Sequence, residues 1–493
     1  MENMNWNAIA PELVLLAMAM VVALVDLWVK HPRRTPTYVL AQVSLGVVAL
    51  LHWNAFDAGG TVYAMQRMVV ADPMGHLLGL FATLATMVAL VYARPYAAAR
   101  DMLKGELITL SMLSLLGILV MQSANNFLVV YLGLELMSLS LYALVALRRD
   151  HTVATEAAMK YFVLGALASG FLLYGLSMMY GATGSLDIGV VFEKIAGGSI
   201  NQGVLVLGIV FVVSGLAFKL GAAPFHMWIP DVYHGAPTAV TALVAGAPKL
   251  AAFAITIRLL VEGMLGVAQD WQQMLIVLAV ASLALGNLGA IAQSNLKRML
   301  AYSTIFHMGF VVLGLTPTVI AGNTLSAANG YSSSLFYVLT YVLTMLGTLG
   351  IIMLLSRQGH ESEHIDDLAG LARNNPWYAA VMAIFMFSLA GIPPTVGFYS
   401  KLAVLQALVS TNVPLYIWLA GIALVLSLIA AFYYLRVIKV MFFDAPAAEL
   451  TIQSSGEMRA VLSVNGALVL LFGLLPGGLM AMCADAIAKA LGT

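Results

Sequence analysis

Four ionisable residues lie near the middle of long apolar stretches of the sequence, namely Glu135, Lys219, Lys249 and Lys401. An isolated charge at that depth of a bilayer costs at least about 2.5–3.5 kcal/mol on insertion scales, so each residue needs a partner, water or a function. Loss of hydration favours the neutral amine of a lysine, whereas a nearby carboxylate favours the ammonium. Lys219 with Glu135 is therefore a candidate switchable proton holder, and Lys249 and Lys401 are candidate next stations of a proton relay.

Two histidines are candidate further members of this relay. His307 follows the polar run 302–304, and His226 lies seven residues after Lys219. Haem ligation is a competing use of intramembrane histidine, but it needs facing pairs, and these histidines lie singly on separate apolar segments. The charged residues could instead be structural pairs that fix helix registry, although one glutamate against three lysines leaves that interpretation incomplete.

The composition predicts the environment in which these residues work. Of 493 residues, 61% are hydrophobic and 9% are charged, the net charge is +0 and the mean hydropathy is +0.94. Such a chain is a membrane domain, and it offers no basic surface to nucleic acid. Cys483 is the single cysteine, which excludes an internal disulfide, a thiolate-held iron–sulfur cluster and a cysteine-based zinc site.

We expect an all-α integral membrane protein with about fourteen transmembrane helices, because a span needs about 20 apolar residues. The predicted spans lie near 8–29, 38–56, 76–93, 106–122, 127–147, 159–181, 203–227, 237–261, 272–292, 300–316, 331–355, 377–410, 414–440 and 459–480.

The basic residues predict the orientation of these spans. The loops after spans 1, 3, 5, 9, 11 and 13 hold Lys30, Arg33, Arg34, Arg94, Arg100, Lys104, Arg148, Arg149, Lys297, Arg298, Arg357, Arg373, Lys439 and Arg459. The opposite side holds Arg67, Lys194 and Lys489. Since cytoplasmic loops carry the excess of Lys and Arg, we expect both termini outside the cytoplasm. Arg258, Arg436 and Lys160 lie near span ends, from which their side chains are expected to snorkel to the surface.

Spans 7 and 12 are predicted to be discontinuous. Lys219 precedes Pro224 by five positions, and Lys401 follows Pro394 by seven. Proline frees a backbone carbonyl that lipid cannot satisfy, so each break should face protein or a wet cavity. Interrupted segments at matching places indicate repeats, and spans 4–8 and 9–13 form two five-helix units of opposite orientation. The expected divisions are an N-terminal segment 1–105, repeats 106–262 and 270–442, and a C-terminal segment 443–493.

Three stretches of the sequence carry a resemblance to a known family. Residues 218–238 contain Pro-Asp-Val-Tyr-His-Gly-Ala-Pro, and residues 295–309 and 389–398 contain the other matches. These stretches resemble the antiporter-like membrane subunits of respiratory NADH:quinone oxidoreductase (complex I), and the first is similar to the N-type branch of that family. The resemblance extends over essentially the full length of the chain.

This resemblance implies a proton-translocating subunit in a bacterial inner (plasma) membrane. The basic residues of the loops predict that both termini are periplasmic. It implies a Glu on helix 5 and lysines on helices 7, 8 and 12, which match Glu135, Lys219, Lys249 and Lys401. It also implies no cofactor in this subunit, since NADH, FMN, iron–sulfur clusters and quinone belong to the rest of the complex. The implied partners are other membrane subunits of complex I, especially neighbouring antiporter-like subunits, and the lipid bilayer.

One alternative function shares the same fold. A subunit of a multisubunit cation/proton antiporter would have the same broken helices and buried lysines. The Pro-Asp-Val-Tyr-His-Gly-Ala-Pro stretch at 230–237 favours the complex I subunit. That assignment makes the chain part of an enzyme, although it predicts no redox centre of its own.

Overall fold

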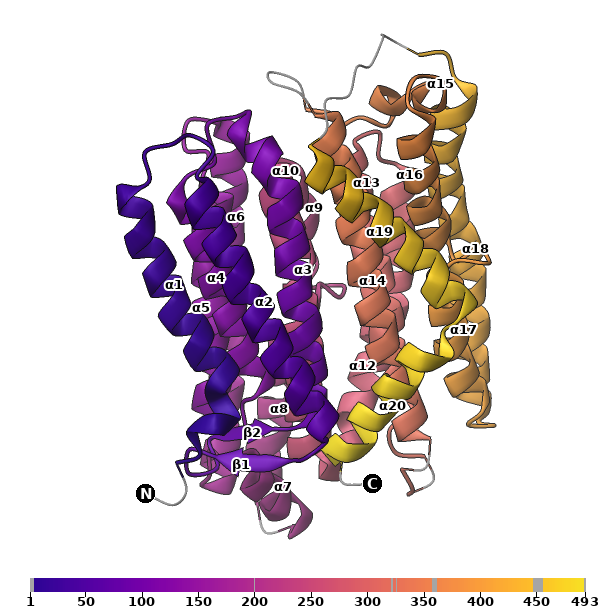
Figure 1. The fold of residues 1–493 in the computed structure, drawn as a ribbon. Coiled ribbons are helices and arrows are strands. Elements are labelled where there is room, and N and C mark those ends of the chain that lie inside the picture. Colours follow the sequence, from indigo (N-terminus) through magenta and orange to yellow (C-terminus); the bar gives the residue numbers. More distant parts are fainter. Residues whose placement is uncertain are drawn as a thin grey trace.

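In its described residues the protein is a nearly all-helical membrane bundle with a small β-hairpin (Figure 1). The computed structural model describes residues 4–198, 200–320, 322–324, 326–356, 361–446 and 455–491, and Arg357 of the basic loops lies outside them. Within these ranges, twelve helices are long and apolar enough to cross a membrane. They contain α1 (Ala10–Trp28), α2 (Thr35–Ala58), α3 (Pro73–Ala98), α4 (Gly105–Gln122), α5 (Phe127–Val145), α6 (Thr152–Thr183), α8 (Gln202–Leu220), the segment Thr238–Gly263, α12 (Ala268–Ile291), α14 (Ala327–Leu355), α18 (Pro414–Phe443) and α19 (Gly456–Leu474).

Two further segments occupy the positions of the remaining predicted spans. One is α13 (Leu296–Gly314), and the other is the pair α16 (Pro376–Ala390) and α17 (Val396–Val409). The all-α membrane class is confirmed, whereas the exact number of spans, the inverted repeats and the four sequence divisions stay predictions. The shorter elements are β1 (Val62–Ala64), β2 (Val69–Ala71), α7 (Ile188–Ala196), α9 (Trp228–Gly235), α15 (Leu371–Asn374) and α20 (Gly477–Leu491).

The predicted span 237–261 differs from the structure because it is interrupted. Helix α10 (Thr238–Ala245) ends before Gly246, whose backbone leaves the helical region at φ −91° and ψ −110°. Helix α11 (Ala247–Thr256) then begins with Lys249 in its first turn and widens into a π-helix over Ile257–Gly263. Such widened turns are frequent at functional sites.

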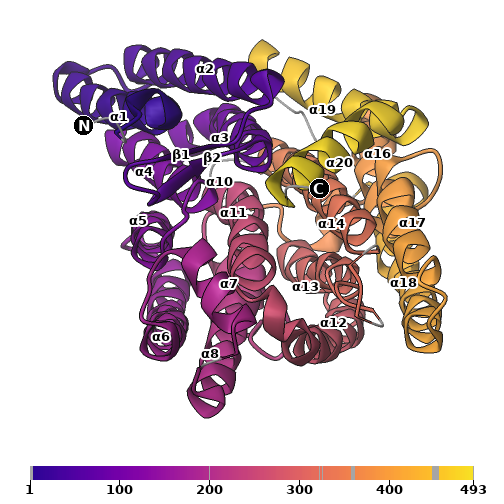
Figure 2. The ribbon, with the colours of Figure 1, turned by 90° about the horizontal axis from the view of Figure 1, so that it is seen from below.

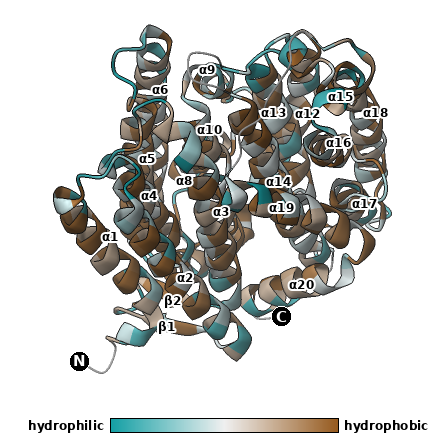
Figure 3. Ribbon diagram, turned by 45° about the horizontal axis from the view of Figure 1, so that its top comes forward, coloured by the Kyte–Doolittle hydropathy of each residue, from teal (hydrophilic) through white to brown (hydrophobic). Residues whose placement is uncertain are grey.

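The most deeply buried helices form the interior of the bundle. Seen along the bundle, α10, α11 and α14 lie inside, and α1, α6, α8 and α18 lie at the periphery (Figure 2). The peripheral helices are hydrophobic along their lengths, and the hydrophilic colours gather at the loops (Figure 3). Helices α19 and α20 pack across α14 and α3, which joins the end of the chain to its beginning. Both termini lie at the same end of the bundle (Figure 1).

The interpretation of Arg258 as a snorkelling side chain is wrong. Its side chain is 1% exposed and donates to both carboxylate oxygens of Asp72, with Nη1 2.6 Å from Oδ2 and Nη2 2.8 Å from Oδ1. Nη1 also lies 2.7 Å from Glu262 Oε1. Asp72 in turn accepts from the Gly75 N–H at the start of α3. This buried network ties α3 to the π-helical segment, so the arginine is a structural tie between helices.

Candidate functional site

The two discontinuous helices end in the same way. Helix α8 ends at Leu220, followed by Gly221 with φ +86°, and the Gly221 N–H donates to the carbonyls of Ala217 and Phe218. Helix α16 ends at Ala390, followed by Gly391 with φ +83°. Glycine adopts this left-handed conformation without the penalty that a Cβ would bring.

The equivalent bonds at the second break have the same spacing. The Gly391 N–H donates to the carbonyls of Phe387 and Ser388, and the Ile392 N–H donates to Phe387. Ala222 makes the corresponding bond to the Ala217 carbonyl. In both helices these turn bonds leave the last two helical carbonyls to be satisfied by another donor.

A buried lysine supplies that donor at each break. Lys249 Nζ donates to the carbonyls of Leu220 at 2.9 Å and Lys219 at 3.4 Å. Lys401 Nζ donates to the carbonyls of Ala390 at 2.8 Å and Leu389 at 3.1 Å. A cation is favourable at a helix C-terminus, where the helix dipole is negative. The sequence matched Lys219 with Lys401, but the lysine that corresponds to Lys401 in its contacts is Lys249.

Aromatic rings complete both lysine sites. Lys249 Nζ lies 5.2 Å from the centre of the Trp228 ring, and Lys401 Nζ lies 5.2 Å from the centre of the Phe306 ring. Lys401 also donates to Ser427 Oγ at 2.9 Å. Lys249 is 1% exposed and Lys401 is 6% exposed. Within the described part of the chain, no carboxylate lies within 4.0 Å of either ammonium, so both cations are bound by neutral groups alone.

Lys219 is held by hydroxyl groups from two neighbouring helices. Its Nζ lies 2.9 Å from Ser138 Oγ on α5 and 3.4 Å from Ser169 Oγ on α6. Glu135 lies one turn before Ser138 on α5, and its buried Oε1 has no hydrogen-bond partner. These two residues form no ion pair within 4.0 Å in the described structure. Glu135 therefore lies one helical turn from the serine that holds Lys219, but the two charged residues are not paired.

Lys219 and Lys249 share one small cavity. Its lining includes both lysines together with Trp228, Phe218 and Pro248. The carbonyl of Lys219 also accepts from Lys249, so the two residues are joined through the end of α8. Lys401 belongs to the other broken helix, and α13 supplies the Phe306 ring beside it.

His307 on α13 lies in a buried polar network and follows Phe306, whose ring lies beside Lys401. Its Nδ1 is 2.8 Å from the Tyr337 hydroxyl, and its Nε2 is 3.0 Å from the Tyr434 hydroxyl. Tyr434 also contacts Ser303, and Tyr341 donates to Thr304 Oγ1 at 2.7 Å. These tyrosines are not among the residues that the sequence pattern singled out. The i, i+4 spacing of Tyr337 and Tyr341 is the sequence signal that could have placed both on one face of α14.

His226 is not brought to the other candidate residues. It lies half-buried in the turn between α8 and α9, beside the exposed Met227. Its Nδ1 has no hydrogen-bond partner among the residues that the structure describes. The same described ranges contain no group of three or more His, Cys, Asp or Glu side chains arranged to hold a metal ion.

Comparisons with known proteins agree on one kind of membrane subunit. The family model described as "NADH:quinone oxidoreductase/Mrp antiporter, TM" matches residues 124–468. The chain is 60% identical over 489 residues to NADH-quinone oxidoreductase subunit N of Polaromonas naphthalenivorans (strain CJ2), which covers 99% of this chain and 98% of that relative.

Two solved structures show the same fold. A chain of respiratory complex I from Thermus thermophilus with bound aureothin has a TM-score of 0.80 at 29% identity, covering 97% of this chain and 100% of its own. A chain of the Mrp complex from Dietzia sp. DQ12-45-1b has a TM-score of 0.86 at 19% identity, covering 99% of both chains. The likeness to the Mrp chain, at that identity, is one of fold alone.

Proposed function

Because this chain belongs to the family of NADH-quinone oxidoreductase N subunits, antiporter-like membrane subunits of complex I, we propose that it moves protons through Glu135, Lys219, Lys249 and Lys401. The energy would come from quinone reduction elsewhere in the complex. NADH, FMN, the iron–sulfur clusters and the quinone would be bound by other subunits, and this chain would contribute no redox centre.

The observation that carries the proposal is the way Lys249 and Lys401 are held. Each ammonium is buried and donates to backbone carbonyls at the end of a broken helix. A lysine paired with a carboxylate would leave an unpaired buried anion when it lost its proton, and that is costly. A lysine bound to carbonyl and hydroxyl groups leaves only neutral groups behind. These two sites are therefore suited to repeated loading and unloading of a proton.

Lys219 and Glu135 supply the switch in this proposal. When Glu135 is separate, the serine hydroxyls of Ser138 and Ser169 hold the ammonium. Approach of the carboxylate would stabilise the ammonium further, and its withdrawal would favour transfer of the proton towards Lys249 in the shared cavity. His307 with its tyrosine partners is then the polar connection towards Lys401. His226 makes no contact with these residues in the described structure, and its membership of the relay stays a prediction.

The surroundings of Glu135 support a partner subunit as the source of the switch. On α5, Leu132 is 65% exposed and Leu139 is 54% exposed, on either side of Glu135. A neighbouring antiporter-like subunit at this apolar face would change the environment of the carboxylate, and lipid would cover the rest of the periphery. We place the protein in the bacterial inner membrane with both termini periplasmic, on the charge of its loops.

The proposal is tested by replacing Lys249 with methionine in the assembled complex. Methionine has similar length and volume but holds no proton, so we expect NADH oxidation to continue with fewer protons moved per NADH. Lys194→Met, on the short helix α7 outside the spans, is the matched control and should pump normally. Normal proton movement per NADH in an assembled Lys249→Met complex would contradict the proposed relay.

A further inference from the structure

A cavity of about 500 Å³ opens beside the ends of α4 and α5, between the α3–α4 loop and the α5–α6 loop. Both loops belong to the end of the bundle that carries the excess of basic residues. The charged part of its lining comes mainly from the two loops, and the apolar part comes mainly from the two helices. The cavity therefore joins charged loops to helices that span the membrane.

The charged side chains of this cavity have both signs. They are the cations Lys104, Arg148 and Arg149 and the anions Asp101, Glu106 and Asp150. Within the described part of the chain, none of the six forms an ion pair within 4.0 Å. A ligand of one sign would be repelled by half of these side chains, whereas a ligand that carries a charge of each sign can contact both sets at once.

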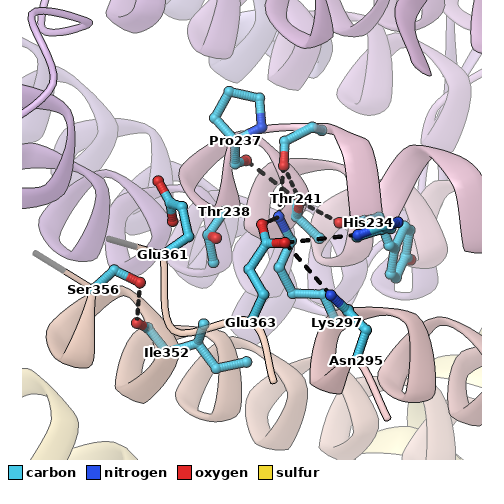
Figure 4. Close-up of polar contacts among 12 residues, drawn as sticks. His234, Pro237, Thr238, Thr241, Asn295, Lys297, Ile352, Ser356, Glu361 and Glu363 are labelled. Carbon is cyan, nitrogen blue, oxygen red and sulfur yellow. Dashed lines mark hydrogen bonds and ion pairs between the residues drawn. The ribbon is translucent and has the colours of Figure 1, made fainter. Parts of the chain in front are cut away.

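Arg100 also lines the cavity, but its charge is already balanced. Its Nε lies 2.6 Å from Glu361 Oε1. Glu361 stands in a second polar cluster, in which Glu363 contacts both Lys297 and His234 (Figure 4). The unpaired charges of the first cavity therefore sum to zero, and the cavity favours a zwitterion over an anion.

The cavity has the depth of a lipid headgroup layer. Its lining includes Glu106 in the first turn of α4 and Leu110 one turn further into that helix, with Ala143 on α5. Four helical residues span about 6 Å. The polar layer on each side of a bilayer is about 5–7 Å thick. Leu110 and Leu113 are both half-buried on one face of α4, so an apolar surface continues from the cavity into the membrane.

We propose that this cavity binds the headgroup of phosphatidylethanolamine, a zwitterionic phospholipid whose acyl chains follow Leu110 and Ala143. The phosphate is held by the guanidinium groups of Arg148 and Arg149, whose planar donors match phosphate oxygens. The primary ammonium donates hydrogen bonds to the carboxylates on the other side of the cavity.

The donor set also separates this lipid from phosphatidylcholine. A quaternary ammonium has no N–H to donate, and proteins commonly recognise it with aromatic rings. The described lining of the cavity contains carboxylates and no aromatic ring. A primary ammonium is therefore the group that fits the anionic side.

A direct crosslink between lipid and protein tests the proposal. A water-soluble carbodiimide joins a carboxylate to a primary amine by an amide bond, and the reagent takes up the water that is released. The assembled complex is placed in vesicles of phosphatidylethanolamine and phosphatidylglycerol, treated with this reagent and digested for mass spectrometry. We expect a lipid adduct on Asp101, Glu106 or Asp150, with a yield at least fivefold above that on Glu457. Glu457 is 44% exposed at the same end of the bundle and pairs with Arg94, which has no primary amine.

Two double variants test the phosphate contacts. Arg148→Gln with Arg149→Gln leaves the carboxylates in place and should reduce the adduct at least fivefold. Lys30→Gln with Arg33→Gln is the matched control, because it removes the same charge from exposed positions of the α1–α2 loop at the same end. The control should give the adduct in wild-type yield.

Three results would overturn the proposal. Equal yields on the cavity carboxylates and on Glu457 would mean that both meet only bulk lipid. An unchanged yield in the Arg148→Gln, Arg149→Gln variant would mean that the phosphate is not bound there. Absence of the lipid adduct would mean that an anionic lipid or another subunit fills the cavity, and a crosslink to a lysine of that subunit would identify the second case. None of these results depends on proton movement, so the site and the proposed relay are tested separately.

Discussion

Lys219 Nζ donates a hydrogen bond to Ser138 Oγ at 2.9 Å, and Ser138 lies on α5 one helical turn after Glu135. Glu135 is the carboxylate that we propose controls this lysine. The lysine is therefore held by a neutral partner. A small movement of α5 would replace the Ser138 hydroxyl beside the ammonium with the Glu135 carboxylate. A switch that works by such an exchange depends on the serine as well as on the two charged residues.

Ser138→Ala is expected to reduce proton movement per NADH at least twofold. A hydrogen bond to a charged group is worth about 1.5–3 kcal/mol, and its loss disfavours the ammonium in the separated arrangement. Ser140→Ala is the matched control, because Ser140 Oγ donates to the Leu136 carbonyl of its own helix and makes no other hydrogen bond within the described residues. Pumping measured in membrane vesicles at equal NADH oxidation should separate the two variants, and equal loss in both would count against a role for the serine.

Gly221→Ala is expected to destabilise the protein by more than about 1 kcal/mol, since alanine is strained at φ +86°. Its Cβ would lie 2.0 Å from Ile229 Cδ1 and 3.4 Å from Lys249 Nζ, so the lysine site should be disturbed as well. Gly421→Ala in α18 meets nothing within 4 Å and should be neutral or stabilising. Thermal unfolding of the assembled complex checks the sign of both effects.

Asp72→Asn is expected to cost about 3–5 kcal/mol, because it leaves the buried Arg258 guanidinium without its main counter-charge. The exposed pair Lys489–Asp485 provides the comparison, and Asp485→Asn should change the stability by less than about 0.5 kcal/mol. The fraction of assembled complex and its thermal midpoint are the measurements. A mild effect of Asp72→Asn would mean that water or Glu262 compensates the arginine.

The loss of thermal stability at acidic pH should depend on His234. Burial lowers the pKa of its imidazole in the folded protein, while Glu363 opposes the shift. The unfolded chain then binds more protons below about pH 6.5, the usual His pKa, so this residue's contribution to stability is present above that pH and declines as the pH falls. The thermal midpoint of His234→Gln should therefore fall less than that of the wild type between pH 7.5 and pH 5.5. An identical fall in both would show that the pKa of His234 is the same in the folded and the unfolded chain.

The sequence predicted the charged members of the site because they stand out in apolar segments. Glu135, Lys219, Lys249 and Lys401 each interrupt a long hydrophobic run, and glycine and proline mark the two breaks. The roles of these residues, and those of His307 and His226, stay predictions. Their neutral partners could not be predicted in the same way, since serine, threonine and tyrosine are common in membrane helices and nothing local distinguishes Ser427 from Ser463.

Contacts between residues that lie far apart in the chain could not be predicted from the sequence either. Arg258 and Asp72 lie 186 residues apart, so an arginine near a span end was interpreted as a surface group. The carbonyl contacts of Lys249 depend on the interruption at Gly246 and on the packing of α11 against α8. Neither feature produces a recognisable pattern of hydrophobic and polar residues in the sequence. Sequence periodicity reports which helices exist, whereas the partners of a buried charge depend on their packing.

The most direct test of the account is the number of protons moved per NADH oxidised by assembled complexes that carry Lys219→Arg. Arginine keeps the positive charge and can still donate to Ser138, but guanidinium does not release its proton at any usable pH. We predict that NADH oxidation continues while proton movement per NADH falls at least twofold. Wild-type proton movement per NADH in a fully assembled Lys219→Arg complex would contradict the account, because Lys219 would then act through its charge alone.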